Sequence, residues 1–108
     1  MGSYPYGVAF DGAVIWVANF NGNDVTKLRA SDGSVLGTFP VGNLPQSVVF
    51  DGVNIWVTNF SSNSVTKLRA SDGALIGTFP VGQFPEGAAF DGANVWVVNA
   101  GSDTVSKR

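Results

Sequence analysis

Short apolar runs alternate with short polar clusters along the whole chain. Residues 7–10 (GVAF), 15–20 (IWVANF), 25–30 (VTKLRA) and 35–41 (VLGTFPV) are separated by Asp-Gly pairs or by clusters of Asn, Ser and Gly. Runs of this length that are rich in β-branched and aromatic residues are typical of strands joined by tight hairpins. The pattern predicts four antiparallel strands in this part of the chain and no helix.

The same pattern recurs with a period of 40 residues, as the spacing of Trp16, Trp56 and Trp96 shows. Roughly two thirds of the positions match between the first two copies, far more than chance gives. Four strands in about 40 residues is the size of one propeller blade. We therefore predict an all-β chain with a single domain at residues 1–108, made of blade 1 (5–44), blade 2 (45–84) and an incomplete blade 3 (85–108).

Hydrophobic patterning within a blade supports this architecture. The run at residues 15–18 shows no alternation, as expected for a strand that neighbouring blades bury on both faces. In the next strand Val25, Lys27 and Arg29 share one side, and Thr26 and Leu28 share the other. We expect that strand to lie further out, where a long basic side chain reaches water.

Three motifs link the chain to a known group of repeats. The segments WVTNF (56–60) and GTFPVG (77–82), with PxxxxFDG (45–52) before them, resemble YVTN-type β-propeller repeats, and more distantly the blades of the virginiamycin B lyase and NHL families. The resemblance implies the fold, whereas propellers host binding scaffolds, hydrolases, lyases and oxidoreductases alike. Lyases of that family carry histidines near the centre, often after the loop proline, where this chain has Tyr6, Gln46 and Glu86. Because the chain has no histidine, the resemblance implies that lyase activity is absent.

Composition narrows the function classes further. The net charge is -2 with 13% charged residues, so no basic surface is expected to bind nucleic acid. The chain has no cysteine and no histidine, which removes disulfides, thiolate nucleophiles, the usual zinc sites and the commonest general base. We expect no cofactor, no metal and no membrane segment. As written the chain is expected to be soluble, its compartment is unknown, and the resemblance suggests an extracytoplasmic location if a leader was removed.

The strand count suggests how the ring closes. The repeats supply eleven of the twelve strands of three blades, or about 2.75 blades, whereas propellers usually need four to eight. Two large apolar faces would then be bare. We therefore expect a homo-oligomer, with a homodimer of six blades favoured and a homotrimer as the alternative.

Several repeated residues have a structural interpretation beside a functional one. The three tryptophans are interpreted as packing residues between blades rather than stacking platforms for a ligand. The Asp-Gly pairs are interpreted as hairpin turns with positive φ rather than calcium ligands. The basic residues of the third strands are interpreted as a solvated outer edge rather than an anion site. Asn19, Asn59 and Asn99 are expected to hydrogen-bond the adjoining loop.

Sequence differences between the repeats concentrate in two sets of loops. The loop between the second and third strands and the loop between blades emerge on the same rim of a four-stranded meander, and both vary, whereas the turns on the other rim are nearly identical. Loops on a rigid scaffold are frequent binding sites, and aromatic rings among amides suit carbohydrate or protein ligands. The alternative is that tolerant loops drift. The candidate binding residues are Tyr6, Phe20, Asn21, Gln46, Phe60, Ser61, Glu86 and Asp103, and no catalytic or metal-binding residue is assigned.

Three functions remain open from the sequence. The first is a non-catalytic, self-assembling propeller module that offers its variable rim to a partner. The second is a degenerate or metal-assisted lyase or hydrolase that uses Glu86 and Asp103 near the axis. The third is a recently amplified or engineered propeller fragment whose only property is assembly.

Overall fold

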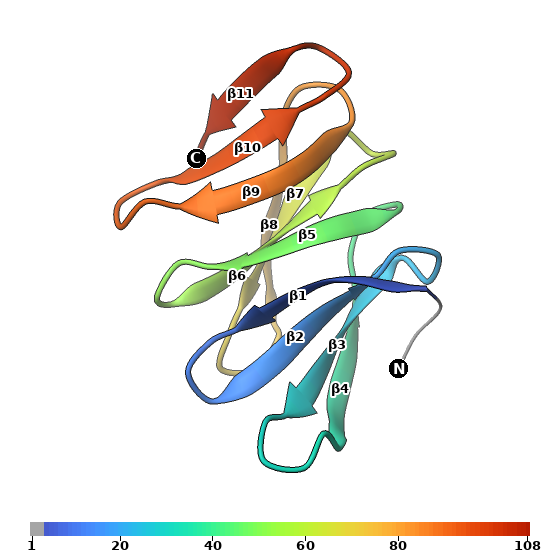
Figure 1. The fold of residues 1–108 in the computed structure, drawn as a ribbon, viewed down its shortest axis with the longest axis vertical. Coiled ribbons are helices and arrows are strands. Elements are labelled where there is room, and N and C mark those ends of the chain that lie inside the picture. The colour runs from blue at the N-terminus through green and yellow to red at the C-terminus, as the bar shows by residue number, and fades with distance from the viewer. Residues whose placement is uncertain (1–3) are drawn as a thin grey trace.

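The computed structural model describes residues 4–108, and over that range the chain forms eleven β-strands and no helix (Figure 1). The prediction of four strands per repeat is confirmed for the first two copies, and the third copy has three strands. The strands are β1 (Pro5–Phe10), β2 (Val14–Asn19), β3 (Asp24–Arg29), β4 (Val35–Pro40), β5 (Pro45–Phe50), β6 (Asn54–Asn59), β7 (Ser64–Arg69), β8 (Leu75–Pro80), β9 (Pro85–Phe90), β10 (Val95–Asn99) and β11 (Thr104–Lys107).

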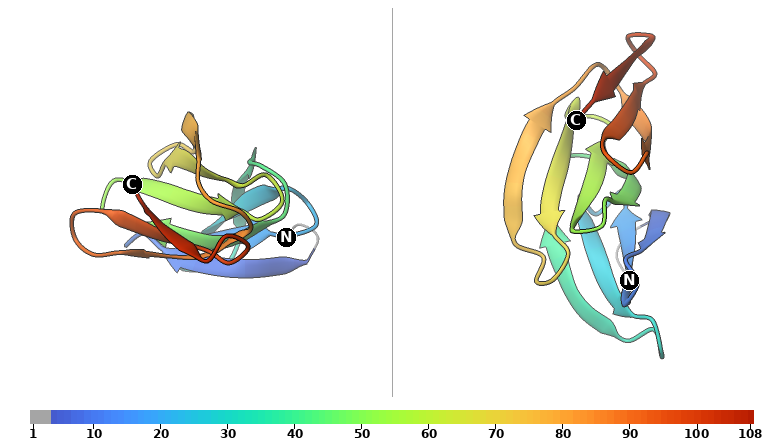
Figure 2. Two further views of the ribbon diagram at one scale, coloured as in Figure 1. Left: turned by 90° about the horizontal axis from the view of Figure 1, so that it is seen from above. Right: turned by 90° about the vertical axis from the view of Figure 1, so that its left-hand side faces the viewer.

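Each repeat forms its own antiparallel sheet in the order of the sequence. The sheets are β1-β2-β3-β4, β5-β6-β7-β8 and β9-β10-β11, and they are called blades 1, 2 and 3. The first strands of the three blades lie next to one another, β5 between β1 and β9 (Figure 1), and the blades stack as a curved wedge (Figure 2). Short hairpins produce this order because neighbouring strands in sequence pair directly.

Asp-Gly turns behave as the sequence predicts. Gly12, Gly52 and Gly92 have φ values of 94°, 98° and 101°, a region that a residue with a Cβ rarely enters. In the first of these turns Asp11 Oδ1 accepts hydrogen bonds from the backbone N–H groups of Ala13 (2.9 Å) and Val14 (2.8 Å). The same bonds recur in the other two copies, which fixes the register of each first hairpin.

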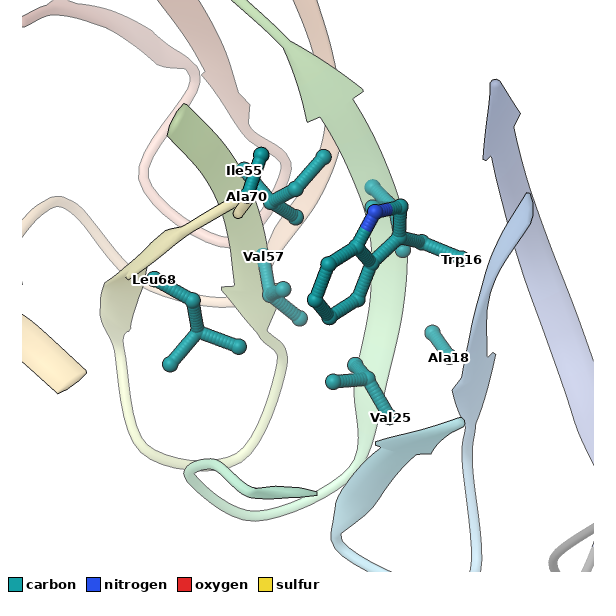
Figure 3. Packing of buried hydrophobic residues seen from close by; sticks show 8 residues of the cluster. Trp16, Ala18, Val25, Ile55, Val57, Leu68 and Ala70 are labelled. Carbon is teal, nitrogen blue, oxygen red and sulfur yellow. The ribbon is translucent and has the colours of Figure 1, made fainter. Parts of the chain in front are cut away.

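The hydrophobic core lies between blades. Trp16 and Val25 of blade 1 pack against Ile55, Val57 and Leu68 of blade 2, and the indole of Trp16 points into this layer (Figure 3). A second layer of the same kind joins Trp56 of blade 2 to the facing residues of blade 3. The interpretation of these tryptophans as packing residues is thus confirmed for Trp16 and Trp56.

Every blade therefore has two different faces. The front face packs on the preceding blade, and in blade 2 it includes Val48, Phe50, Ile55, Val57 and Leu68. The rear face packs on the following blade, and it includes Trp16, Ala18, Val25 and Phe39 in blade 1. Within residues 4–108 the front face of blade 1 and the rear face of blade 3 have no blade against them.

Candidate functional site: the variable rim

Tyr6, Gln46 and Glu86 lie at an irregularity in the first strand of each blade. The strand pairing skips between Pro5 and Gly7, between Pro45 and Val48, and across the matching part of β9. Such bulges twist a strand and redirect the side chains that they carry. The side chains of Tyr6 and Glu86 are exposed and that of Gln46 is half-buried. The three positions where the resemblance would place histidines are thus the bulged positions of the innermost strands.

Backbone hydrogen bonds tie the two sets of variable loops together, as their common rim requires. Phe20 N–H donates to the carbonyl of Tyr4 (2.9 Å), and Phe60 N–H donates to that of Leu44 (3.0 Å). Each loop also reaches the next blade, because Leu44 N–H donates to Oδ1 of Asn23 (2.9 Å). The same bond joins blades 2 and 3 through Asn63 and Phe84, at 3.0 Å. The variable loops therefore form one continuous rim.

Aromatic rings gather at two places on this rim. Tyr4, Tyr6 and Phe20 form a cluster in blade 1, with ring centroids 5.5–6.0 Å apart, and both tyrosines are exposed. Phe60 stacks on Phe84 with a centroid distance of 5.0 Å. The structure thus brings Tyr6 and Phe20 together, and it places Phe60 beside an aromatic ring of the next blade.

The other candidate residues are not assembled into one site. Asn21 and Ser61 are exposed in the loops after β2 and β6. Asp103 occupies a left-handed turn position with φ 53°, the place that Asn23 and Asn63 hold in the other blades. Its use together with Glu86 near the axis stays a prediction.

Asn19, Asn59 and Asn99 are buried, and each donates through Nδ2 to two oxygens of the neighbouring strand, while Asn59 also accepts a hydrogen bond from the loop between blades. Asn59 Nδ2 donates to Thr66 Oγ1 (2.8 Å) and Ser64 Oγ (3.2 Å) on the neighbouring strand. Its Oδ1 accepts from Gly42 N–H (3.0 Å) in the loop between blades. The expected hydrogen bond to an adjoining loop is confirmed at Asn59, and the bonds to β7 are additional.

On the opposite rim the structure shows a cleft that the sequence did not predict. It has a volume of about 420 Å³ and lies between blades 1 and 2. Its walls come from the nearly identical turns, with Asp11, Lys27, Phe50, Val53 and Ser71 among the lining residues. Both charged residues of this group already have partners inside the protein.

Those partners form a unit of Asp, Trp and Lys that recurs in every blade. Trp16 Nε1 donates to Asp11 Oδ2 (2.9 Å), and Lys27 Nζ lies 5.4 Å from the centre of the Trp16 ring. Lys27 Nζ also donates to the carbonyls of Ala70 (3.4 Å) and Ser71 (3.3 Å) in blade 2. The expectation of a solvated basic edge is therefore wrong for Lys27, because the ring and the carbonyls of the next blade hold its ammonium group. It is correct for Arg29, which is exposed and paired with Asp32 at 3.3 Å.

The hydrogen bonds of this unit lower the pKa of its carboxyl group. Burial by itself raises the pKa of Asp11, but the bonds from Trp16 and from the backbone of Val14 and Ala13 outweigh it and hold the pKa below the ordinary value. At Asp91 the bond from Trp96 is the largest cause, and the pKa falls to about 2. The carboxylates therefore serve as charged acceptors within the fold.

Residues 4–108 contain neither a candidate metal-binding cluster nor a candidate membrane-spanning helix. No group of three or more histidine, cysteine, aspartate or glutamate residues lies close enough to hold a metal ion. No helix there is long and apolar enough to cross a membrane.

Comparison with known proteins gives similarity in fold. No protein-family model matches the chain, and no curated protein matches its sequence. Among solved structures, hydrazine synthase from Kuenenia stuttgartiensis is 23% identical with a TM-score of 0.75, covering 95% of this chain and 34% of that one. A functionally unknown protein from Desulfotomaculum acetoxidans is 20% identical with a TM-score of 0.79, covering 100% of this chain and 42% of that one.

Virginiamycin B lyase from Staphylococcus aureus, a β-propeller, is 21% identical with a TM-score of 0.78, covering 95% of this chain and 36% of that one. At such identities the likeness shows the fold alone, and the chain spans well under half of these three proteins. The resemblance to YVTN repeats stays a prediction. The prediction of an all-β chain built of propeller blades is confirmed.

Proposed function

We propose that this chain is a non-catalytic propeller module that assembles with a second copy of itself and presents its variable rim to a ligand. Assembly is supported by the similarity between the two open faces of the chain and the faces that are buried between its blades. The front face of blade 1 and the rear face of blade 3 carry nearly the same residues as the faces that pack against each other inside the chain. Two surfaces that already fit within one molecule also fit between two molecules.

Equivalent residues show how much apolar surface the two open faces expose. Val8 of blade 1 is 65% exposed, whereas Val48, its equivalent in blade 2, is 7% exposed. Trp96 of blade 3 is 39% exposed, whereas Trp16 is fully buried. Val105 is likewise exposed although its two counterparts in blades 1 and 2 are buried. Contiguous apolar surface of this kind marks interaction sites in soluble proteins.

Polar groups at the open faces are also matched. Lys107 lies over Trp96 as Lys27 lies over Trp16, so the second copy would offer it the carbonyls of Ala30 and Ser31, the equivalents of Ala70 and Ser71. Asp103 would similarly accept a hydrogen bond from the backbone N–H of Tyr4 in the second copy. The same bond is made by Asn23 and Asn63 within the chain. Ring closure would therefore satisfy charged groups as well as bury apolar ones.

Backbone clearance supports the same contact. A Cβ built on Gly7 would lie 2.1 Å from the carbonyl oxygen of Gln46, so the first strands of blades 1 and 2 approach closely there. Gly87 holds the equivalent position in blade 3, and a Cβ built on it meets nothing within 4 Å. The first strand of another blade can approach Gly87 as β5 approaches Gly7.

The number of blades favours two copies. Three blades from each of two chains give six, within the usual range of closed propellers, whereas three chains would give nine. The contact joins two different faces, so it forms a closed ring only if the rotation between copies closes, and otherwise it forms a filament. A two-fold ring is the smallest closed solution.

The test measures mass with one interface variant and one control. Multi-angle light scattering should give twice the 11.2 kDa of the chain. Val8→Asp should lower the mass to that of one chain or raise the dissociation constant at least tenfold, since it places a charge on the open face. Val53→Asp changes an equally exposed valine in the turn before β6 and should leave the mass unchanged. A folded wild-type monomer at high micromolar concentration would overturn the assembly.

The rim provides the second part of the proposal. Exposed Tyr4 and Tyr6 beside Phe20, which Asn21 follows directly in the chain, suit a carbohydrate or a protein surface. A glycan array and a pull-down with the assembled protein would test this, using Tyr6→Ala as the matched variant. If the protein forms a closed ring but binds neither class of ligand, assembly alone remains as the proposed function.

A further inference from the structure

The cleft between blades 1 and 2 places two opposite charges at one opening without joining them. Asp11 and Lys27 both line the cleft, and within the described chain they form no salt bridge with each other. All the lining residues belong to blades 1 and 2, which pack against each other inside the chain, so the cleft exists without a second copy. Its volume of about 420 Å³ lies in the range of small-molecule sites, roughly 300–1,000 Å³.

The ammonium group of Lys27 is held in place by groups that carry no net charge. Its Nζ donates to the carbonyls of Ala70 (3.4 Å) and Ser71 (3.3 Å) and lies over the ring of Trp16. Both bonds are longer than an ordinary N–H···O bond of about 2.9–3.0 Å. A carboxylate accepts shorter and stronger bonds from an ammonium group than a carbonyl does. Lys27 can therefore bind a carboxylate that enters the cleft.

The carboxylate of Asp11 can accept a further hydrogen bond. Its Oδ1 accepts from the backbone N–H groups of Ala13 and Val14, whereas the structure gives Oδ2 one bond, from Trp16 Nε1. Burial raises the pKa of Asp11, but these bonds and, to a smaller degree, the positive charge of Lys27 lower it, so the group is ionised at neutral pH. Each carboxylate oxygen has two acceptor sites, which leaves one at Oδ2 for a ligand.

Apolar surface lies in the same cleft as the two charges. Phe50 is half-buried, and Val53 is 69% exposed. An aliphatic group placed against these two side chains would remove apolar surface from water. A ligand with a single charge would be attracted by one of the charged residues and repelled by the other. The cleft therefore suits a ligand that carries both charges and a short apolar side chain.

We propose that this cleft binds a small zwitterion, an α-amino acid with an aliphatic side chain. Its carboxylate would accept hydrogen bonds from Lys27 Nζ, its ammonium group would donate to Asp11 Oδ2, and its side chain would lie against Phe50 and Val53. This site goes beyond the proposed function, because it lies on the rim opposite the variable loops and does not require the ring.

Blade 2 supplies a matched control inside the same molecule. Trp56 Nε1 donates to Asp51 Oδ2 at 2.7 Å, and Lys67 Nζ lies 4.8 Å from the centre of the Trp56 ring. Lys67 is not among the residues that line the cleft. Lys67→Met thus removes the same kind of cation–π contact as Lys27→Met and leaves the proposed site intact.

The probe is L-leucine, titrated into the isotope-labelled wild-type chain and followed by NMR spectroscopy. Saturable shifts are expected at the backbone amides of Ala13, Val53 and Ser71, which line the cleft. Lys27→Met retains an unbranched stem over Trp16 and should weaken leucine binding at least about tenfold, because it removes the partner of the carboxylate. Lys67→Met should leave the affinity unchanged. Urea unfolding of both variants checks that they fold.

Two analogues of leucine test each charge without any change to the protein. N-acetylleucine lacks the ammonium group and leucine amide lacks the carboxylate, and each should bind at least about tenfold more weakly than leucine. Leucine amide should bind wild type and Lys27→Met equally, since it has no carboxylate for Lys27 to hold.

Three results would overturn the proposal. They are the absence of saturable shifts at tens of millimolar leucine, equal affinity for leucine and N-acetylleucine, and equal losses from Lys27→Met and Lys67→Met. Light scattering on the same samples measures the mass of the assembly, so a failure of leucine binding and a failure of ring formation are distinguishable.

Discussion

Asn59 provides the most direct test of how the blades are joined, because three segments depend on one buried side chain. Asn59→Ala removes the bonds to Thr66 and Ser64 on β7 and the bond from Gly42 N–H in the loop before blade 2. The side chain is fully buried, so water cannot replace these partners without entering the core. The substitution thus acts on the strand pair and on the junction between blades at once.

The magnitude follows from counting the lost interactions. Three hydrogen bonds at about 1 kcal/mol each give a loss of about 3 kcal/mol, and a donor left without an acceptor moves the value upward. A domain of this length has a free energy of unfolding of about 5–15 kcal/mol. The substitution should therefore remove a fifth or more of the stability and still leave a folded protein that can be measured.

Urea unfolding followed by tryptophan fluorescence, at one fixed protein concentration, measures the loss. The m value should stay unchanged, since the surface exposed on unfolding is the same. Asn43→Ala is the matched control, because Asn43 is exposed in the same junction loop and should change stability by less than about 0.5 kcal/mol. If Asn59→Ala lowers the stability no more than Asn43→Ala does, the account of the buried asparagines is refuted.

Four further substitutions can be tested with the same unfolding assay. Thr58→Val should lower the free energy of unfolding by about 1–3 kcal/mol, because the hydroxyl is buried and donates to the carbonyl of Glu86 in blade 3 (3.1 Å). A loss near zero would contradict a stabilising role for this hydrogen bond between blades. Trp56→Ala should cost about 3–5 kcal/mol at any protein concentration. Trp96→Ala should cost clearly less in dilute solution and approach that value as the ring forms, and a loss independent of concentration would argue against the ring. The pKa of Asp91 is lowered from 3.8 to about 2 in the folded protein. Its ionised carboxylate therefore contributes fully to the free energy of unfolding above about pH 4, and this contribution is lost as the pH falls toward 2. The difference in stability between wild type and Asp91→Asn should shrink over that window.

The fold could be predicted from the sequence because every local signal is repeated. A single Asp-Gly pair is weak evidence for a hairpin, whereas the same pair at the same place in three copies, each followed by the same apolar run, leaves few alternatives. The period itself then selects the architecture. Trp16 illustrates the limit of this reasoning, since its burial could be predicted from its recurrence but its hydrogen bond to Asp11 could not.

The interactions that the sequence did not reveal depend on register and on contacts between blades. Lys27 lies over Trp16 because β2 and β3 pair with these two residues opposite each other, and the length of the intervening loop does not fix that register. Its carbonyl partners at Ala70 and Ser71 are more than 40 residues away in the chain. The recurrence of Asp, Trp and Lys at constant spacing in every copy was the available signal for the unit.

The differences between the copies bear on how two chains would meet. At the blade 2 to blade 3 junction Thr58 makes a hydrogen bond, whereas Ala18 and Val98 hold its place in the other blades and make none through a hydroxyl group. A blade 3 to blade 1 contact between copies would therefore have an apolar Val98 beside Gly87, where β1 of the second copy can approach closely. A contact between two front faces would bury Val8 and its neighbours as well, but it would leave Lys107 and Asp103 without their partners. The polar matches thus favour the contact between unlike faces, which is the contact that the proposed ring of two chains requires.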